Sequence, residues 1–437
     1  MLPFLAAMQH GQAPKKAIDS NSSTFCQELI IKLANERLVP LFSGAKQIQV
    51  APTTEKHKLV ATCGPSKIRF KFNEQDAIAY VIERQQNFGK IGDSSVNEPK
   101  IIQAFVDVAK EMRSPLNECY DDIQEAFSIR MIAASLSKDD KVLRETIITL
   151  IKQLDRWSRG TYEGRQHSAA IGIISTNALS SALAEEILHE DFTSVLSNGY
   201  DTLILCTKDG FFAGHETLGH EISPSAHAPY RLLPLATWAK EGKIALALNR
   251  KGEILIFKDN QLLFARRCGH WHFLPHRAII TQIKYPERPI TIREKIYETC
   301  LDSSFAGSGA CIGVVLKKQM SDLNEIITRK DDYLTSSSSK KAHALKAIIQ
   351  DKKFQELNRL ARAELSAIDG ALLLDEEGTI ISVGTILNIS AGSEAGGRLA
   401  AARTLAKLGV GIKVSQDGSI RGFKGAETNS EPILTVM

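Results

Sequence analysis

Three short stretches near the C-terminal end of the sequence carry residue types that bind phosphates and metal ions. The first is the triplet Asp369-Gly370-Ala371, in which an acid opens an otherwise apolar strand. A carboxylate in such a place costs free energy unless a partner compensates its charge. An Asp followed by two small residues fits a metal ligand beside a nucleotide, because the small residues leave room for a sugar or a base. The alternative is that Asp369 caps a nearby turn or helix.

The second stretch is a glycine-rich turn between a strand and a helix, GSEAGGRLAAARTLAKLG at 392–409. Such a turn presents free backbone N–H groups and the positive end of a helix, which together favour phosphate. Gly396 and Gly397 let the backbone approach a ligand closely, and Arg398 could offer two donors to a phosphate oxygen. Arg398-Leu399 stand where a P-loop has Lys and Ser/Thr, which excludes a standard Walker A motif. The alternative is a plain connection without a ligand.

The third stretch is VSQDGSI at 414–420, where Ser415 and Asp417 lie just beyond a strand. Asp417 could be a second carboxylate for a divalent ion, since Mg²⁺ and Mn²⁺ favour oxygen ligands. The alternative is a hairpin turn, because Asp417-Gly418 is a favoured turn dipeptide.

Weaker patterns elsewhere point to ordinary structure. His215 and His220 are five positions apart, whereas two zinc-binding histidines on one helical face are four apart. His270 and His272 would point the same way on a strand, and an aromatic strand edge is the better interpretation. Cys206 and Cys300 have no identifiable catalytic partner, so we interpret both as core thiols.

The elements that must position these residues follow from hydrophobic periodicity. The first part predicts a helix at 25–38, strands at 46–51, 58–64 and 67–73, and mostly helix over 75–157. A boundary at 158–165 is followed by strands, among them a three-stranded antiparallel meander over 243–267.

From about residue 291 the pattern changes to alternating helix and strand. We expect a helix at 292–307, a buried strand at 310–318, polar helices over 319–365 with a surface loop at 335–341, and then the three motif-bearing stretches. The predicted fold class is α/β (α+β overall), with a C-terminal mixed-sheet α/β nucleotide-binding domain after an α+β sensor-like region containing the meander. The predicted domains are 1–157, 158–289 and 290–437.

The composition sets limits on the class of protein. With 437 residues, 43% hydrophobic and 24% charged, the chain is typical of a soluble protein with two to three domains. A net charge of +4 does not argue for nucleic acid or a membrane as partner, and no apolar run reaches membrane-spanning length. The 7 cysteines are scattered singly, which predicts buried free thiols in a reducing cytoplasm.

The order of the three stretches resembles the diadenylate cyclase domain of the DisA type. That family has an Asp-Gly-Ala motif, then Arg-His-Arg-Ala-Ala, then Val-Ser-Glu-Glu. This sequence has Asp369-Gly370-Ala371, then Arg398-Leu399-Ala400-Ala401 after two glycines, then Val414-Ser415-Gln416-Asp417. The resemblance covers roughly residues 290 to 437, and a single arginine stands where the family has two. The region before it resembles, more vaguely, sensor regions that precede such domains in some bacterial proteins.

The resemblance implies a function and a set of site residues. Two domains face each other in a homo-oligomer, each holding one ATP with Mg²⁺ or Mn²⁺, and condense the two into cyclic di-AMP under control of the N-terminal region. It implies Asp369 and Arg398 as catalytic residues and Asp369 and Asp417 as metal ligands. The implied nucleotide-binding residues are Gly370, Ala371, Leu387, Gly396, Gly397, Arg398 and Ser415. The alternatives are a catalytically inactive nucleotide or cyclic-dinucleotide sensor, and a purely structural adaptor.

Overall fold

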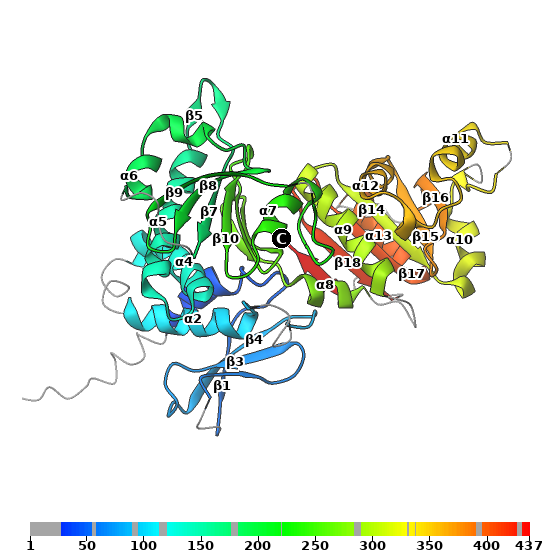
Figure 1. Cartoon of the computed structure of the whole chain (residues 1–437). Helices are drawn as coiled ribbons and strands as arrows, with labels where there is room; N and C mark the ends of the chain where they lie inside the picture. The colour runs from blue at the N-terminus through cyan, green and yellow to red at the C-terminus, as the bar shows by residue number, and fades with distance from the viewer. Residues whose placement is uncertain are drawn as a thin grey trace, which may run out of the picture.

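The computed structural model describes residues 28–54, 58–89, 95–112, 120–175, 182–219, 221–283, 290–329, 332–336, 338–389, 396–425 and 431–437. Two sheet-centred units lie side by side, and a smaller sheet built from the first strands lies beneath them (Figure 1). Mixed parallel and antiparallel sheets with covering helices confirm the predicted α/β, α+β class.

The N-terminal sheet has four strands in the order β1-β4-β3-β2, with every pairing antiparallel. Its strands are β1 (Gln49–Pro52), β2 (Val60–Thr62), β3 (Lys67–Phe70) and β4 (Ile78–Glu83). A helical segment precedes it and ends in a π-helix, Ala34–Leu38. The expectation of mostly helix from residue 75 was wrong for β4. Its aromatic and β-branched residues suit a strand, and pairing with β1 and β3 stabilises that conformation.

Three long helices follow: α2 (Glu98–Glu111), α4 (Tyr120–Ser137) and α5 (Lys141–Ser158). Two of them begin at polar caps, because Asn97 accepts from the Lys100 N–H at 3.2 Å and Asp140 from the Leu143 N–H at 3.0 Å. The helices share one hydrophobic core with the following sheet. The predicted domain boundaries stay a prediction.

The central sheet has seven strands in the order β13-β12-β11-β10-β7-β8-β9. Their bounds are β7 (Ala169–Ile174), β8 (Thr202–Thr207), β9 (Phe212–Thr217), β10 (Ile244–Leu248), β11 (Ile254–Lys258), β12 (Gln261–Arg267) and β13 (His270–Phe273). Strands β10 to β12 are the predicted antiparallel meander, and only β7 and β8 pair in parallel among the described strands of this sheet. Short elements surround it: β5 (Thr161–Tyr162), β6 (Arg165–Gln166), α6 (Ala184–Leu188), α7 (Leu233–Trp238) and α8 (His276–Gln282).

The C-terminal sheet has six strands in the order β16-β15-β14-β17-β18-β19. They are β14 (Ala310–Val315), β15 (Ala371–Asp375), β16 (Ile380–Thr385), β17 (Gly409–Val414), β18 (Ile420–Lys424) and β19 (Leu434–Val436). Only β14 and β15 are parallel among these described strands, so the sheet is mixed as predicted.

Helices cover both faces of this sheet. The core on one face includes residues of α9 (Ile290–Ala306) and α12 (Arg359–Ala367), and the core on the other includes residues of α10 (Met320–Ile326) and α13 (Gly397–Leu408). The remaining helix, α11 (Lys340–Ile349), begins inside the predicted surface loop at 335–341. Ser339 caps it by accepting from the Ala342 N–H at 3.2 Å, so the loop is shorter than expected.

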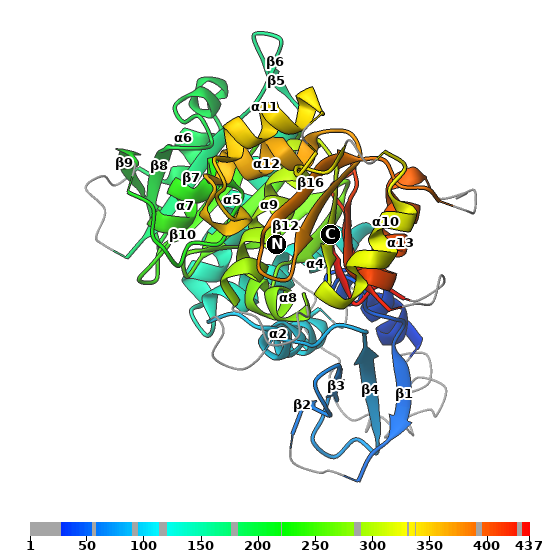
Figure 2. The same ribbon diagram turned by 90° about the vertical axis from the view of Figure 1, so that its right-hand side faces the viewer.

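The N-terminal unit contacts the last strand of the chain. Ser43 Oγ accepts from the Met437 N–H at 3.0 Å, and Gln86 Oε1 accepts from the Thr435 N–H at 2.7 Å. The Leu41 carbonyl also accepts from the Phe273 N–H at 2.9 Å. These contacts join the small sheet to both larger units, and Figure 2 shows its strands projecting away from them.

Cysteine chemistry and hydropathy give two further findings. All five described cysteines are free, as predicted, but Cys63 and Cys268 are exposed, so the expectation that all are buried was wrong for these two. Cys26 and Cys119 lie outside the described residues. Within the described ranges, no helix combines the length and apolar character needed to cross a bilayer.

Candidate functional site

The predicted site residues gather where the strands of the C-terminal sheet begin or end on one side. We call this row of strand ends the edge of the C-terminal sheet. Strands β14 and β15 are parallel and both begin at this edge, where β16 and β17 end. Because α13 runs directly into β17 and packs along it, the helix starts at the same edge at which that strand ends. The fold therefore brings the residues before β15 and the first turn of α13 to a common edge, although they are some 30 positions apart in the sequence.

Asp369 is exposed and lies two positions before β15. Gly370 follows with φ +105°, in a region that side-chain-bearing residues rarely adopt. A Cβ at Gly370 would lie 2.5 Å from the carbonyl carbon of Gly384, so only glycine allows β15 to meet the end of β16 here. The requirement for glycine after the acid is therefore steric, and the close strand pairing fixes the backbone that carries Asp369.

The first turn of α13 is open to approach. Its N-cap is Gly396, at φ +91°, and an added Cβ at Gly396 or Gly397 would meet no atom within 4 Å. The N-cap offers no side chain to the first amides of the helix, whose positive end favours an anion. The remainder of the predicted glycine loop, 390–395, lies outside the described residues.

Arg398 extends from this turn toward the start of β14. A Cβ at Gly309 would lie 2.7 Å from Arg398 Nη1, so the guanidinium sits directly over that glycine. Cys311 lies beneath the same turn, and burial raises the pKa of its thiol to about 12, which excludes it as a nucleophile near neutral pH. Arg398 thus places a permanent positive charge at the sheet edge.

Other predicted residues at this edge are structural in character. Ala371 and Leu387 are buried in the core on the α13 side, and Leu387 forms an isolated bridge with Ile327. The Ser415 N–H donates to the Ser419 carbonyl at 2.8 Å and thereby closes the turn after β17. These residues border the site, but their own groups are used in packing and in the turn.

The structure does not bring Asp417 to Asp369. Asp417 lies in the β17–β18 turn and accepts from the Ser419 N–H at 3.0 Å, which is the turn role considered as the alternative. Strand β14 lies between β15 and β17, so at least two strand spacings, roughly 10 Å, separate the two positions. The turn also packs against α9, where Ser304 Oγ donates to the Gly418 carbonyl. The metal-binding role of Asp417 stays a prediction, and the contact that the structure shows for its carboxylate is the one within the turn.

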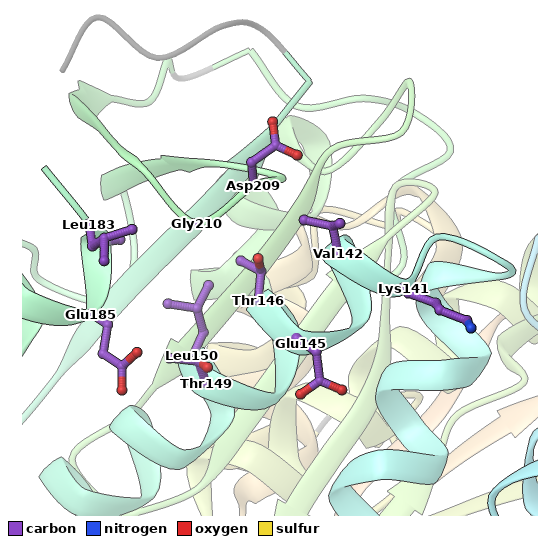
Figure 3. A pocket seen from close by; sticks show the side chains of 11 residues that line it. Lys141, Val142, Glu145, Thr146, Thr149, Leu150, Leu183, Glu185, Asp209 and Gly210 are labelled. Atoms are coloured by element: carbon purple, nitrogen blue, oxygen red, sulfur yellow. The ribbon is translucent and has the colours of Figure 1, made fainter. Parts of the chain in front are cut away.

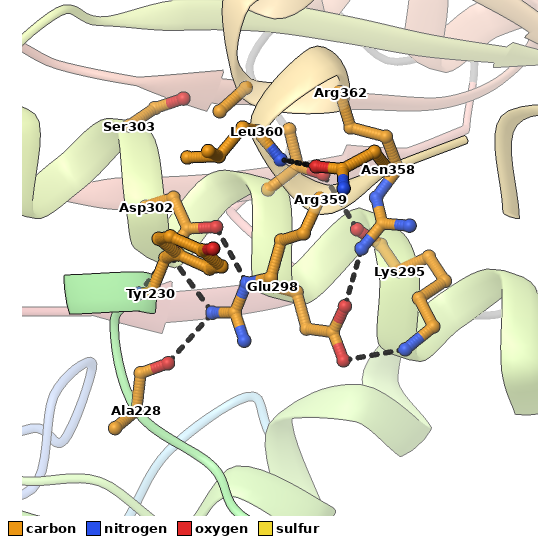
Figure 4. Close-up of polar contacts among 12 residues, drawn as sticks. Ala228, Tyr230, Lys295, Glu298, Asp302, Ser303, Asn358, Arg359, Leu360 and Arg362 are labelled. Atoms are coloured by element: carbon orange, nitrogen blue, oxygen red, sulfur yellow. Dashed lines mark hydrogen bonds and ion pairs between the residues drawn. The ribbon is translucent and has the colours of Figure 1, made fainter. Parts of the chain in front are cut away.

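Helix α12, which leads into Asp369, is anchored by partly buried ion pairs (Figure 4). Arg359 donates to both oxygens of Asp302, at 2.7 and 2.9 Å, and to the Ala228 carbonyl at 2.7 Å. The Tyr230 N–H also donates to Asp302, at 2.7 Å. Burial raises the pKa of Asp302, although the Arg359 and Tyr230 hydrogen bonds act in the opposite direction.

A second ion pair holds the middle of α12. Arg362 donates to Glu298 Oε2 at 2.6 Å and to the Leu357 carbonyl at 2.8 Å, and Lys295 donates to Glu298 Oε1 at 2.8 Å. Burial lowers the pKa of Arg362. Since α12 ends at Ala367, these contacts hold the helix end two positions from Asp369.

Sequence reasoning missed several residues beside Asp369. Lys341 Nζ lies 2.9 Å from both the Gly384 carbonyl and Asp332 Oδ1, which places a second cation near the edge. Ile368 directly precedes Asp369 and Ile386 directly follows β16, and their side chains are 41% and 46% exposed. No spacing in the sequence connects Lys341 to Asp369; only the pairing of β15 with β16 brings their neighbourhoods together.

The residues present fit a metal ion only together with a substrate. Among the described residues, no group of three or more His, Cys, Asp and Glu could hold an ion by itself. Mg²⁺ commonly binds through one or two carboxylates plus substrate phosphates and water. The exposed Asp369, at the same end of the sheet as Arg398, suits that mode, in which the nucleotide supplies most of the ligands.

The weaker histidine patterns give no metal site in the described part of the chain. His215 lies on β9 and not on a helix, and His220 lies outside the described residues. His270 and His272 lie on the edge strand β13, and burial lowers the pKa of His272 to about 4. As expected, β13 is an aromatic edge strand.

A groove of about 440 Å³ lies away from this edge, between α5 and the β8–β9 turn (Figure 3). Thr146 on its wall donates to the Lys208 carbonyl at 2.8 Å, which fixes the turn to the helix. None of the predicted site residues lines this groove.

Comparisons with known proteins leave the family open. No protein-family model matches the chain, and no curated protein matches it. Among solved structures, a double mutant of DacA from Staphylococcus aureus, a diadenylate cyclase, is similar at 14% sequence identity and a TM-score of 0.22. The match covers 31% of this chain and 81% of that chain. A similarity of this strength carries no argument about fold or activity.

Proposed function

We propose that the edge of the C-terminal sheet binds ATP with Mg²⁺ or Mn²⁺, and that two such edges facing each other in a homo-oligomer condense two ATP molecules into cyclic di-AMP. The observation that carries this proposal is the meeting of Asp369, Gly370 and the first turn of α13 with Arg398 at one edge. These residues also carry the sequence resemblance to the DisA-type cyclase domain.

Each group has a distinct part in the proposed reaction. The first turn of α13 and Arg398 bind the triphosphate, and Ile368 and Ile386 offer apolar surface to the base or sugar. Asp369 holds the 3′-hydroxyl of one ribose for attack on the α-phosphate of the facing ATP and accepts its proton. A new P–O bond forms, the bond to the β-phosphate breaks, and pyrophosphate leaves. The divalent ion, when bound, supplies charge stabilisation on the phosphates.

The reaction requires alignment more than covalent chemistry by the protein. Two reacting nucleotides held in line gain from proximity and from fixed donors on the developing charge. Two such reactions close the ring, so each edge serves in turn with its partner edge. Activity therefore depends on association, and product formation should rise more steeply than linearly with protein concentration.

The test is product formation by the full chain incubated with ATP and Mn²⁺, with chromatography for a cyclic dinucleotide. We expect Asp369→Asn to lower the rate by about 100-fold or more, since general-base groups contribute at that scale. Asp351→Asn is the matched control, because Asp351 is also exposed and its φ of +58° tolerates Asn.

A second outcome separates the enzyme from a nucleotide sensor. The sensor is favoured by the role of Asp417, since one of its carboxylate oxygens already accepts a hydrogen bond within its own turn. Retained ATP or cyclic di-AMP binding in calorimetry, without product at any protein concentration, would refute the cyclase and support the sensor. If neither ATP nor cyclic di-AMP binds, the cyclase and the sensor are both refuted, and the structural adaptor is the hypothesis that is left.

A further inference from the structure

A cavity of about 750 Å³ lies where three parts of the chain meet. Its walls come from the N-terminal sheet around Gly64 and Phe88, from the loop at 224–227, and from α8 and α9. Small-molecule sites commonly have this size and occur preferentially between structural units. None of the predicted nucleotide-binding residues lines the cavity, so it is distinct from the edge of the C-terminal sheet.

Two side chains of opposite charge face this cavity without partners. Arg277 comes from α8 and Glu294 from α9, and within the described residues neither side chain makes an ion pair or a hydrogen bond. Both lie close to His227: burial lowers the pKa of this imidazole, Glu294 raises it, and Arg277 lowers it. The cavity therefore offers one open cation and one open anion around a single histidine.

His227 supplies a fixed acceptor between these charges. Its Nδ1 lies 2.9 Å from the Ser225 carbonyl, so Nδ1 carries the proton and Nε2 of the neutral ring accepts. The ring packs against His276 at a centroid distance of 5.5 Å, with the two ring planes tilted by 31°. His276 is itself held between the Tyr297 hydroxyl at 2.8 Å and the Leu262 carbonyl at 2.7 Å. The acceptor is thus held in place before any ligand arrives.

The other charges that line the cavity are already compensated. Lys295 donates to Glu298 at 2.8 Å, and Glu298 accepts from Arg362 on its other oxygen at 2.6 Å (Figure 4). A purely anionic ligand would pair with Arg277 but meet the uncompensated Glu294. A molecule with groups of both signs complements the two open charges together.

We propose that this cavity binds a small zwitterion that carries an ammonium and a carboxylate group, such as a free amino acid or a dipeptide. Arg277 receives the carboxylate through its two-pronged donors, and Glu294 receives the ammonium. His227 accepts a further N–H, and the apolar walls around Pro65 and Ile280 receive the side chain. This binding is independent of the proposed nucleotide chemistry.

The experiment is calorimetric titration of the full chain with the free amino acids and a panel of dipeptides. The comparison ligands are the same dipeptides acetylated at the amino end and amidated at the carboxyl end. We expect at least one zwitterion to bind and its blocked form not to bind. Arg277→Gln and Glu294→Gln should each weaken binding about 10-fold or more, as for loss of a hydrogen bond to a charged group.

Two matched variants make the result specific. Arg231→Gln removes an exposed arginine outside the cavity and should leave binding unchanged. Asp369→Asn should also bind the zwitterion normally, which separates this site from the nucleotide site. Circular dichroism verifies that every variant is folded. If Arg277→Gln does not fold, Glu294→Gln tests the proposal in its place.

Three results would overturn the proposal. The first is the absence of binding by every zwitterion at millimolar concentration. The second is equal binding of the blocked and free dipeptides, and the third is zwitterion binding that survives substitution of both Arg277 and Glu294. Binding of ATP that is lost in Arg277→Gln but kept in Asp369→Asn would assign the cavity to a nucleotide and count against the zwitterion.

Discussion

Replacement of Gly370 by alanine tests the tight pairing that carries Asp369. At φ +105° an alanine is strained, which costs about 1–3 kcal/mol. Its Cβ would also lie 2.5 Å from the Gly384 carbonyl carbon and 2.8 Å from the Thr385 nitrogen, and backbone crowding of this kind costs about 1–3 kcal/mol more. We therefore expect the β15–β16 hairpin to lose about 3 kcal/mol or more of local stability.

Hydrogen exchange of the β15 and β16 amides, followed by mass spectrometry, measures this loss where it occurs. All three tryptophans, at 157, 238 and 271, lie before the C-terminal sheet, so their fluorescence would report other regions. A loss of about 3 kcal/mol corresponds to exchange roughly 100-fold faster in these strands. ATP binding should weaken together with the protection.

Two glycines of the α13 turn serve as matched controls. In Gly396→Ala the alanine is strained at φ +91°, but its Cβ meets no atom within 4 Å. We therefore expect a loss of about 1–3 kcal/mol in local stability, from backbone strain alone. Gly397→Ala has neither strain nor crowding and should change protection by less than about 0.5 kcal/mol. Exchange in Gly370→Ala within about threefold of the unsubstituted chain would refute the steric argument.

Two further predictions concern buried ionisable groups. The folded pKa of His276 is about 3 because of burial, against about 6.5 in the unfolded chain, so its stabilising contribution is complete above pH 6.5 and declines as the pH falls toward 3. Between pH 7 and 5, protonation of His276 in the unfolded chain should lower the free energy of unfolding by about 2 kcal/mol. In urea titrations, the free energy of unfolding of His276→Gln should therefore depend less steeply on pH. An unchanged pH dependence would contradict this prediction. Arg84 and Glu98 form an ion pair with side chains 1% and 0% exposed, so Arg84→Met should cost about 3–5 kcal/mol by leaving a buried charge. The double variant Arg84→Met, Glu98→Leu should recover most of the lost stability in thermal unfolding. A cost below about 1 kcal/mol for Arg84→Met alone would contradict an ion pair that excludes water.

Much of the fold could be predicted from the sequence because it depends on local patterns. Alternation and turn residues predicted the meander at 243–267 and the apolar strand that Asp369 opens. Strand β4 was missed because a short strand before long helices has little periodicity of its own. The start of α11 was missed because Ser339 in a serine-rich run was interpreted as loop and not as a helix cap.

The candidate site could be predicted only in part. Asp369, Gly370 and Arg398 lie at the same end of the C-terminal sheet, and their role in binding a nucleotide stays a prediction. Gly309 beneath Arg398 could not be found by spacing, because strand order and not sequence distance decides which elements meet. Asp417 has a carboxylate, which is a suitable ligand for a divalent ion. One oxygen of this carboxylate already accepts the Ser419 N–H within the β17–β18 turn.

The contact between the first sheet and the last strand has a consequence for synthesis. Ser43 and Met437 are 394 positions apart, and Gln86 and Thr435 are 349 apart. At about 5–20 residues per second, the ribosome needs roughly 20–70 s to deliver β19 after Gln86 has been added. Throughout that interval Ser43 and Gln86 lack these two partners, so the contact can form only after most of the chain has been made.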